Sequence, residues 1–154
     1  MKPRVYPLSR CRTLVIATVD QLGAGLEERA GRPIVTLLTD NIGGGKLNEL
    51  AAIVVRLLAV DCDYFVCFGR NSERLHDEVD ALAEREAGES KCAVVTTWHV
   101  DETPDDVAEF FINVAGARDT SLLVGIVGAE DGELQTALMQ LASRTEEEDD
   151  TDRI

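Results

Sequence analysis

The sequence predicts an α/β protein in which a mostly parallel β-sheet is covered by helices. Five short apolar runs rich in Val, Ile and Leu do not alternate with polar residues, which is typical of strands buried on both faces. Segments with helical periodicity separate the later runs. Helix start and stop signals occur where the two patterns meet.

The five apolar runs are the expected strands. They cover residues 14–19, 34–38, 64–68, 93–97 and 122–127. Because strand and helix alternate from residue 34 onward, we expect right-handed βαβ crossovers between parallel strands. The expected architecture is a single-domain, three-layer sandwich of the Rossmann-like or flavodoxin-like class, with a sheet of about five strands.

Four stripes of apolar residues at helical spacing predict the helices. They lie in residues 46–60, 75–82, 107–115 and 134–141. Asn71 or Ser72 can cap the second helix. For the third, Thr103 and Pro104 suit the start and Gly116 suits the end.

Residues 20–32 allow two interpretations. Gly23 and Gly25 precede a Leu-Glu-Glu-Arg sequence that fits a short helix or a turn. A helix gives a doubly wound fold with five strands, and this is the interpretation we favour. A turn lets the first two apolar runs pair as a hairpin, which gives four parallel strands with an antiparallel N-terminal strand.

The chain is strongly acidic. Its 15 basic and 29 acidic residues give a net charge of −14. Residues 144–154 contain two basic and six acidic residues, which leaves −10 for the rest. Such a charge repels phosphate backbones and anionic lipid, so we expect neither nucleic-acid nor membrane binding. It favours a basic protein partner or a bound cation, and a contribution to solubility alone is the alternative.

Length and patterning predict one domain. We assign residues 1–143 to it, and the acidic run at residues 146–150 predicts that residues 144–154 form a disordered tail. The first apolar run is too short for a signal-peptide core, and no segment reaches the length of a membrane span. We therefore expect a cytoplasmic protein.

The four cysteines, Cys11, Cys62, Cys67 and Cys92, show no Cys-x-x-Cys spacing. We expect buried, reduced thiols rather than a disulfide framework or a zinc site. Cys67 with His99 is the obvious nucleophilic pair, but Cys67 lies inside an apolar run, which argues against catalysis.

Short sequence patterns stand out in the middle of the chain. They are Cys67-Phe68-Gly69-Arg70 with Glu73-Arg74-Leu75-His76-Asp77, then Thr96-Thr97-Trp98-His99 and Phe110-Phe111-Ile112-Asn113. These patterns resemble those of a group of small bacterial α/β domains of unknown function. The resemblance covers roughly residues 33–117. It implies no activity, ligand or catalytic residue.

In an open parallel sheet, ligands bind beyond the carboxyl ends of the strands. The best candidate loop there is residues 40–46, where glycine backbone N–H groups, a helix N-terminus and Lys46 could hold an anion. It matches neither a Walker loop nor a dinucleotide fingerprint. With its neighbours, the candidate ligand-binding set is Asp40, Asn41, Gly43, Gly44, Gly45, Lys46, Arg70, Asn71, Trp98 and His99.

Metal and cofactor sites are weaker hypotheses. Asp20 and Asp40, with Glu130 or Asp131 nearby, could share a magnesium ion, but two acids at strand ends are common and we assign no metal site. Trp98 could stack on a flavin, but no hydroxyl-rich phosphate loop follows the first strand. We therefore expect no cofactor.

The leading functional hypothesis is a non-enzymatic binding or regulatory module that contacts a basic protein partner, with homodimerisation left open. Residues 46–60 support it, because Ala52, Val55 and Ala59 lie opposite the main apolar stripe. Such a helix is either central or part of a subunit interface. We favour a central helix whose small residues pack under the N-terminal segment. The alternative function is binding or hydrolysis of a phosphorylated small molecule or nucleotide at the strand ends.

Overall fold

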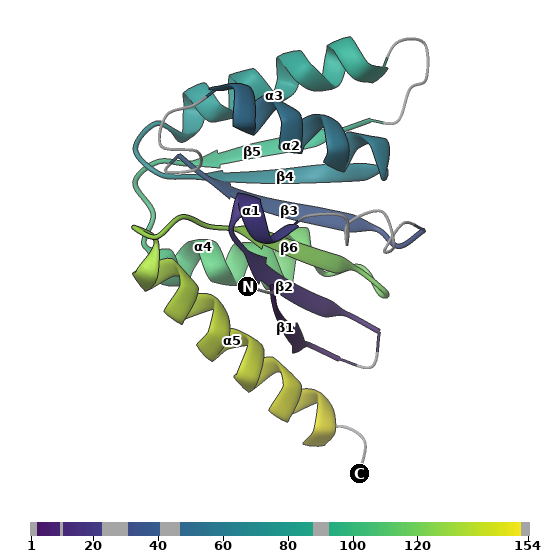
Figure 1. Cartoon of the computed structure of the whole chain (residues 1–154). Coiled ribbons are helices and arrows are strands. Elements are labelled where there is room, and N and C mark those ends of the chain that lie inside the picture. Colours follow the sequence, from purple (N-terminus) through teal and green to yellow (C-terminus); the bar gives the residue numbers. More distant parts are fainter. Residues whose placement is uncertain (1–2, 10, 23–30, 41–46, 88–92, 152–154) are drawn as a thin grey trace.

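A six-stranded, mostly parallel β-sheet forms the centre of the computed structural model of this chain (Figure 1). Residues 3–9, 11–22, 31–40, 47–87 and 93–151 are described. The strands are β1 (Arg4–Pro7), β2 (Thr13–Ala17), β3 (Ile34–Thr39), β4 (Cys62–Phe68), β5 (Val95–His99) and β6 (Leu122–Ile126). The helices are α1 (Val19–Leu22), α2 (Leu47–Ala59), α3 (Ser72–Ala87), α4 (Pro104–Phe110), its π-helical continuation η3 (Phe111–Ala115), and α5 (Gly132–Thr151).

The strand order is β1-β2-β6-β3-β4-β5. The strands from β2 to β6 pair in parallel, and β1 runs antiparallel to β2. The α/β class and the mostly parallel sheet are therefore confirmed, while the sheet has six strands rather than about five. The sequence pattern missed β1 because this strand has only four residues and none of them is buried.

The hairpin of the first two apolar runs, which was the alternative interpretation, does not form. These runs form β2 and β3, and β6 lies between them, parallel to both. The antiparallel N-terminal strand is β1 instead. Between β2 and β3 the chain forms the single turn of helix α1, and residues 23–30 lie outside the described residues.

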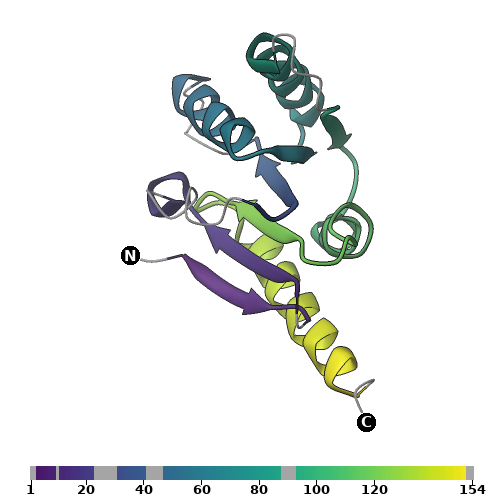
Figure 2. The same cartoon turned by 90° about the vertical axis from the view of Figure 1, so that its right-hand side faces the viewer.

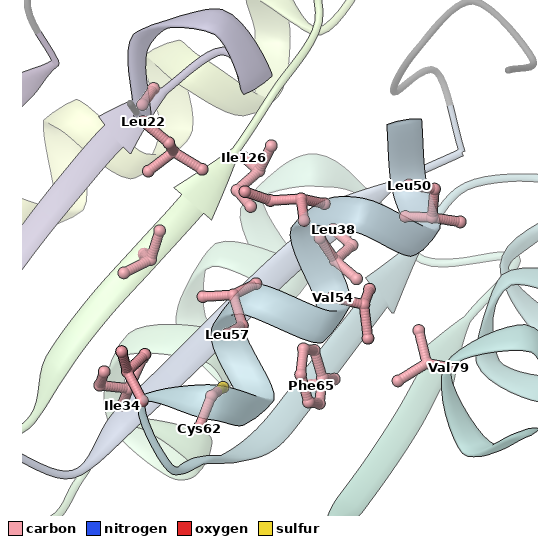
Figure 3. Packing of buried hydrophobic residues seen from close by; sticks show 14 of the residues in the cluster. Leu22, Ile34, Leu38, Leu50, Val54, Leu57, Cys62, Phe65, Val79 and Ile126 are labelled. Carbon is pink, nitrogen blue, oxygen red and sulfur yellow. The ribbon is translucent and has the colours of Figure 1, made fainter. Parts of the chain in front are cut away.

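Helices cover both faces of the sheet (Figure 2). One buried cluster packs the sheet against α1, α2 and α3, and Figure 3 shows Val54 and Leu57 of α2 over Phe65 of β4. A second cluster packs the opposite face against α4, η3 and α5. All six residues of β3 are buried, which explains why the central apolar runs do not alternate.

The predicted start and end of the third helix are confirmed. Thr103 caps α4, because its Oγ1 accepts a hydrogen bond from the Asp106 backbone N–H at 3.2 Å, and Pro104 opens the helix. Gly116 follows η3 and donates its N–H to the Phe111 carbonyl. A Cβ on Gly116 would lie 2.3 Å from a methyl carbon of Leu123, so this close contact requires glycine.

Helix α5 continues through residues 144–151, within the segment whose acidic run predicts a disordered tail. Thr145 Oγ1 donates to the Leu141 carbonyl at 2.8 Å in this part of the helix. The acidic residues 146–148 are exposed, so helix continuation requires no burial of their charge. None of the helices in the described residues is both long enough and apolar enough to cross a membrane.

Helix α2 lies in the layer of helices over β3 and β4 and packs beside α3 (Figure 1). Its apolar stripe of Leu50, Val54 and Leu57 is buried, as predicted. Ala52 and Ala59 on the other side are exposed, so they do not pack under the N-terminal segment as we expected.

Candidate functional site

The carboxyl end of β3 is joined to the loop between β4 and α3 by Asp40. Its carboxylate accepts a hydrogen bond from the Asn71 backbone N–H at 2.8 Å, and its own N–H donates to the Phe68 carbonyl at 3.1 Å. Gly69 in this loop has φ +127°, and a Cβ there would lie 2.3 Å from Asp40 Oδ1. Asp40 therefore fixes the loop just before α3, where a negative charge is also favourable to the helix.

Asp131 joins the end of β3 to the loop between β6 and α5. Its buried Oδ2 accepts one hydrogen bond from Thr39 Oγ1 and another from the Gly128 N–H, both at 2.7 Å. This carboxylate therefore supports the start of α5 and ties two neighbouring strand ends together. Among the described residues, no three His, Cys, Asp or Glu side chains are grouped so that they could hold a metal ion.

His99 is buried on the α4 face of the sheet, with 8% of its surface exposed. Nδ1 contacts the Glu102 carboxylate, Nε2 lies 3.0 Å from Thr97 Oγ1, and the ring packs on Phe110 with centroids 4.6 Å apart. Both ring nitrogens are therefore engaged within the protein.

Cys67 lies on the opposite face of the sheet from His99, in the cluster beneath α2 and α3. The two residues therefore do not form the nucleophilic pair that the sequence suggested. Burial raises the pKa of the Cys67 thiol to about 12. A thiol that is protonated at neutral pH is a poor nucleophile.

The candidate ligand-binding set is only partly brought together. Asp40 and the Asn71 backbone are in contact, and Arg70 beside them is exposed. Trp98 and His99 project from opposite faces of β5. Asn41, Gly43, Gly44, Gly45 and Lys46 lie outside the described residues.

Trp98 is the most exposed of the aromatic side chains predicted at the site, with 46% of its surface accessible. Its ring packs on His76 of α3, with centroids 4.5 Å apart. His76 is only 16% exposed, and its ring nitrogens face Asp77 at 3.1 Å and Asp80 at 3.3 Å. Trp98 is therefore only about half-buried, although it packs on His76. The edge position of β5 is the reason, because it leaves no further strand beside Trp98.

The outer side of β5 is unpaired in the described part of the chain, because β5 pairs with β4 alone (Figure 1). The His99 carbonyl accepts from the Gly69 N–H, so the His99 backbone groups face β4. Because backbone groups alternate in direction along a strand, those of Thr96 and Trp98 face the open edge. We call this edge, together with the exposed side chains of Val95, Trp98 and Val100, the β5 surface.

The surroundings of the β5 surface are acidic. Residues 95–110 contain five acidic residues and no lysine or arginine. Helix α3 adds six acidic residues against two arginines, one of which, Arg74, is paired with Glu78 at 3.4 Å. The sequence indicated the acidic charge and singled out Trp98. It did not reveal that β5 is an edge strand, because that depends on the strand order.

Comparison with known proteins gives one family match. Residues 25–145 match a family model described as Domain of unknown function (DUF7684). A search of curated proteins finds no match. The matched segment includes all of residues 33–117, whose patterns resemble domains of unknown function, and it includes the β5 surface.

Proposed function

We propose that this chain, which belongs to the DUF7684 family of domains of unknown function, is a non-enzymatic acidic binding module that captures a basic, extended segment of a partner protein. The segment binds at the β5 surface. One observation carries this proposal: the open edge of β5 bears an exposed tryptophan in acidic surroundings.

Main-chain hydrogen bonds supply the first part of the recognition. An open edge strand presents unpaired N–H and C=O groups that can template another strand. On β5 these groups belong to Thr96 and Trp98. A partner segment that adds here extends the sheet by one strand, with affinity from its backbone and specificity from alternate side chains.

Charge and the Trp98 ring supply the second part. Lysine or arginine side chains of the partner can approach the Trp98 face, and a cation over an indole gains about 0.5–1 kcal/mol at exposed sites. Asp77 and Asp80 lie around His76, on which Trp98 packs, and Asp101 follows β5 within two residues. Complementary charge of this kind raises association rates and selects against acidic partners.

The fold class and the compartment belong to the same proposal. Helices on both faces support a Rossmann-like or flavodoxin-like sandwich, although the parallel order β2-β6-β3-β4-β5 differs from the flavodoxin order of roughly 2-1-3-4-5. Free thiols at Cys11, Cys62 and Cys67 support a reducing compartment such as the cytoplasm.

Trp98 is the only tryptophan of the chain, so its fluorescence reports on the β5 surface directly. The probe is a blocked hexapeptide of alternating lysine and valine, and the control is its glutamate counterpart. We expect saturable quenching or a spectral shift with the basic peptide, weakening as salt is added. Equal responses to both peptides, or none to the basic one, would contradict the proposal.

Two matched triple variants separate local from overall charge. Asp105→Asn, Asp106→Asn and Glu109→Gln neutralise exposed acids of α4, the helix that follows β5 in the chain. Glu130→Gln, Glu133→Gln and Glu146→Gln remove the same charge from exposed positions in and next to α5. We expect the α4 variant to bind the basic peptide at least fivefold more weakly than the unmodified chain. The α5 variant should bind it less than twofold more weakly. Equal weakening by both would show that only net charge matters.

The second candidate function is binding or hydrolysis of a phosphorylated small molecule at the strand ends. This function has less support, because the Asp40, His99 and Asp131 side chains at the strand ends already contact other groups of the protein. A thermal-shift screen with nucleotides, flavins and divalent cations tests it. A ligand at a hundredfold its Kd adds about 2.7 kcal/mol of stability, which is readily measured.

A further inference from the structure

A cavity of about 570 Å³ lies between α2 and α3, at the amino ends of β4 and β5. It is therefore at the opposite end of the sheet from Asp40 and Asp131. Cavities that bind small molecules have volumes of roughly 300–1,000 Å³. The size alone is thus sufficient for a small organic ligand.

The walls of the cavity explain an anomaly in the sequence. Residues 46–60 are apolar on nearly all sides, and Val55 and Ala59 belong to the side that faces away from the buried stripe. These two residues and Leu58 line the cavity from α2. Val94 lines it from the chain before β5. Val55 and Ala59 of the second apolar side of α2 therefore line a cavity that α3 borders from the other side.

The polar groups of the lining are mostly carboxylates. Within the described part of the chain, Asp61, Asp63 and Glu86 line the cavity, and no lysine or arginine does. Asp63 is neutralised by Arg118, with both oxygens accepting at 2.7–3.0 Å. Asp61, at the end of α2, has φ +64°, a conformation that aspartate and asparagine adopt more readily than most residues. Asp61 and Glu86 are both exposed, and the Glu86 carboxylate also lies 3.6 Å from Nε of Arg85.

We propose that this cavity binds a small amphipathic cation, an amine with a compact apolar body. The apolar body fills the space beside Val55, Leu58 and Val94, and the ammonium group lies near Asp61 and Glu86. Burial of apolar surface stabilises the complex by about 25 cal/mol per Å². An anion of the same shape is repelled by the same carboxylates. This site is separate from the β5 surface and does not depend on its function.

The test uses a pair of probes that differ only in charge. Adamantan-1-ylammonium carries the cation on a rigid apolar cage, and adamantane-1-carboxylate carries an anion on the same cage. Titrations of ¹⁵N-labelled protein followed by NMR should show saturable shifts at Ala59, Ala83 and Val94 with the ammonium probe. The carboxylate should bind at least tenfold more weakly. Equal binding of the two probes, or no binding of the ammonium, would overturn the proposal.

Variants place the probe in the cavity. Ala59→Leu fills the space from an exposed helical position, and Ala52→Leu adds the same bulk to α2 outside the lining. We expect Ala59→Leu to abolish binding and Ala52→Leu to leave it unchanged, with thermal unfolding of both variants confirming that they are folded. Binding to Ala59→Leu as tight as to the unmodified chain would place the probe elsewhere and refute the site.

Charge variants complete the test. Asp61→Asn keeps a residue suited to positive φ, and Glu86→Gln keeps the side-chain shape. The double variant should bind the ammonium probe about tenfold more weakly. Glu84→Gln, an exposed change on α3 outside the lining, should have less than a twofold effect. An unchanged affinity in the Asp61/Glu86 double variant would contradict a cation site.

Discussion

The two edges of the sheet are built in opposite ways. The β1 edge is four residues long, begins with Arg4 and ends with Pro7. Arg4 also holds this edge against α5, where its guanidinium contacts Gln135 and lies 3.3 Å from the Met139 sulfur. The β5 edge exposes Val95 and Trp98, and residues 95–103 contain no lysine, arginine or proline.

Natural sheets block their edges with charged side chains, proline and short strands, because an unprotected edge recruits other chains. The β1 edge uses all three of these devices. The same chain leaves β5 without a basic residue or proline and places an aromatic residue on it. The comparison shows that one edge strand of this sheet carries residues that block pairing. The other, where we propose that a partner strand binds, has no basic residue or proline.

The largest effect is expected from removing the support at the carboxyl end of β5. Gly69 donates its N–H to the His99 carbonyl, and its φ of +127° is strained for any other residue. Gly69→Ala also drives a methyl group into the Asp40 carboxylate. We expect a loss of about 2–4 kcal/mol in the free energy of unfolding, from backbone strain and the disturbed Asp40 hydrogen bond. Urea denaturation measures it.

Two other glycines separate these causes. Gly31 has φ +100°, and a Cβ there would have no neighbouring atom within 4 Å. Gly31→Ala should therefore cost about 1–2 kcal/mol from backbone strain alone. Gly132 has neither feature, so Gly132→Ala should change stability by less than about 1 kcal/mol. If Gly69→Ala cost no more than Gly31→Ala, the Asp40 contact would have no energetic role.

Proline substitutions test which backbone groups of β5 are open. Thr97 faces β4, so Thr97→Pro removes a ladder hydrogen bond and should cost about 1–3 kcal/mol. Thr96 faces the open edge, where proline is tolerated, so Thr96→Pro should cost less than about 1 kcal/mol. Thermal unfolding gives both values.

The same pair of variants sharpens the proposed function. Thr96→Pro should remain folded and yet bind the lysine–valine peptide at least tenfold more weakly, because one donor for strand addition is lost. Unchanged peptide affinity in this variant would show that the peptide contacts side chains without extending the sheet.

Alkaline pH should lower the stability of the folded chain through two buried thiols of β4. Burial raises the pKa of both Cys62 and Cys67 on β4 from 9.0 to about 12. Because these folded-state pKa values lie above the unfolded one, the protonated thiols support folding fully below about pH 9. This contribution is lost as pH rises from about 9 to 12.

Melting temperatures measured from pH 8 to pH 10.5 test this expectation. Cys67→Ala should lower stability at pH 8, since it leaves a small cavity, but its melting temperature should fall less steeply with pH. Cys11→Ala, at an exposed position outside the sheet, should keep the original slope. A slope that is the same in all three proteins would assign alkaline unfolding to other groups.

The sequence alone predicts the features that are decided by residues close together along the chain. The burial of β3, the apolar stripe of Leu50, Val54 and Leu57, and the Thr103 cap follow from composition and spacing. Each of these features is decided within one or two turns or a single strand, where local patterns carry the information.

Features that depend on which strands become neighbours could not be predicted. Nothing in the apolar run of residues 122–127 indicates that β6 inserts between β2 and β3. Without the strand order, the edge position of β5 and the exposure of Trp98 are also hidden. The role of Asp131 was hidden for the same reason, since its partner Thr39 lies 92 residues away.

The smallest effect is expected from removing one protective device of the β1 edge. Arg4 is exposed, so Arg4→Val should change the free energy of unfolding by no more than about 0.5 kcal/mol. It should also leave the protein free of self-association through β1, because Pro7 and the short strand still block pairing. Arg4→Val combined with Pro7→Thr removes two devices and should increase association measurably in sedimentation velocity. If Arg4→Val alone caused the same association, a single arginine would be the whole protection of this edge, and the absence of any arginine on β5 would gain weight as a functional feature.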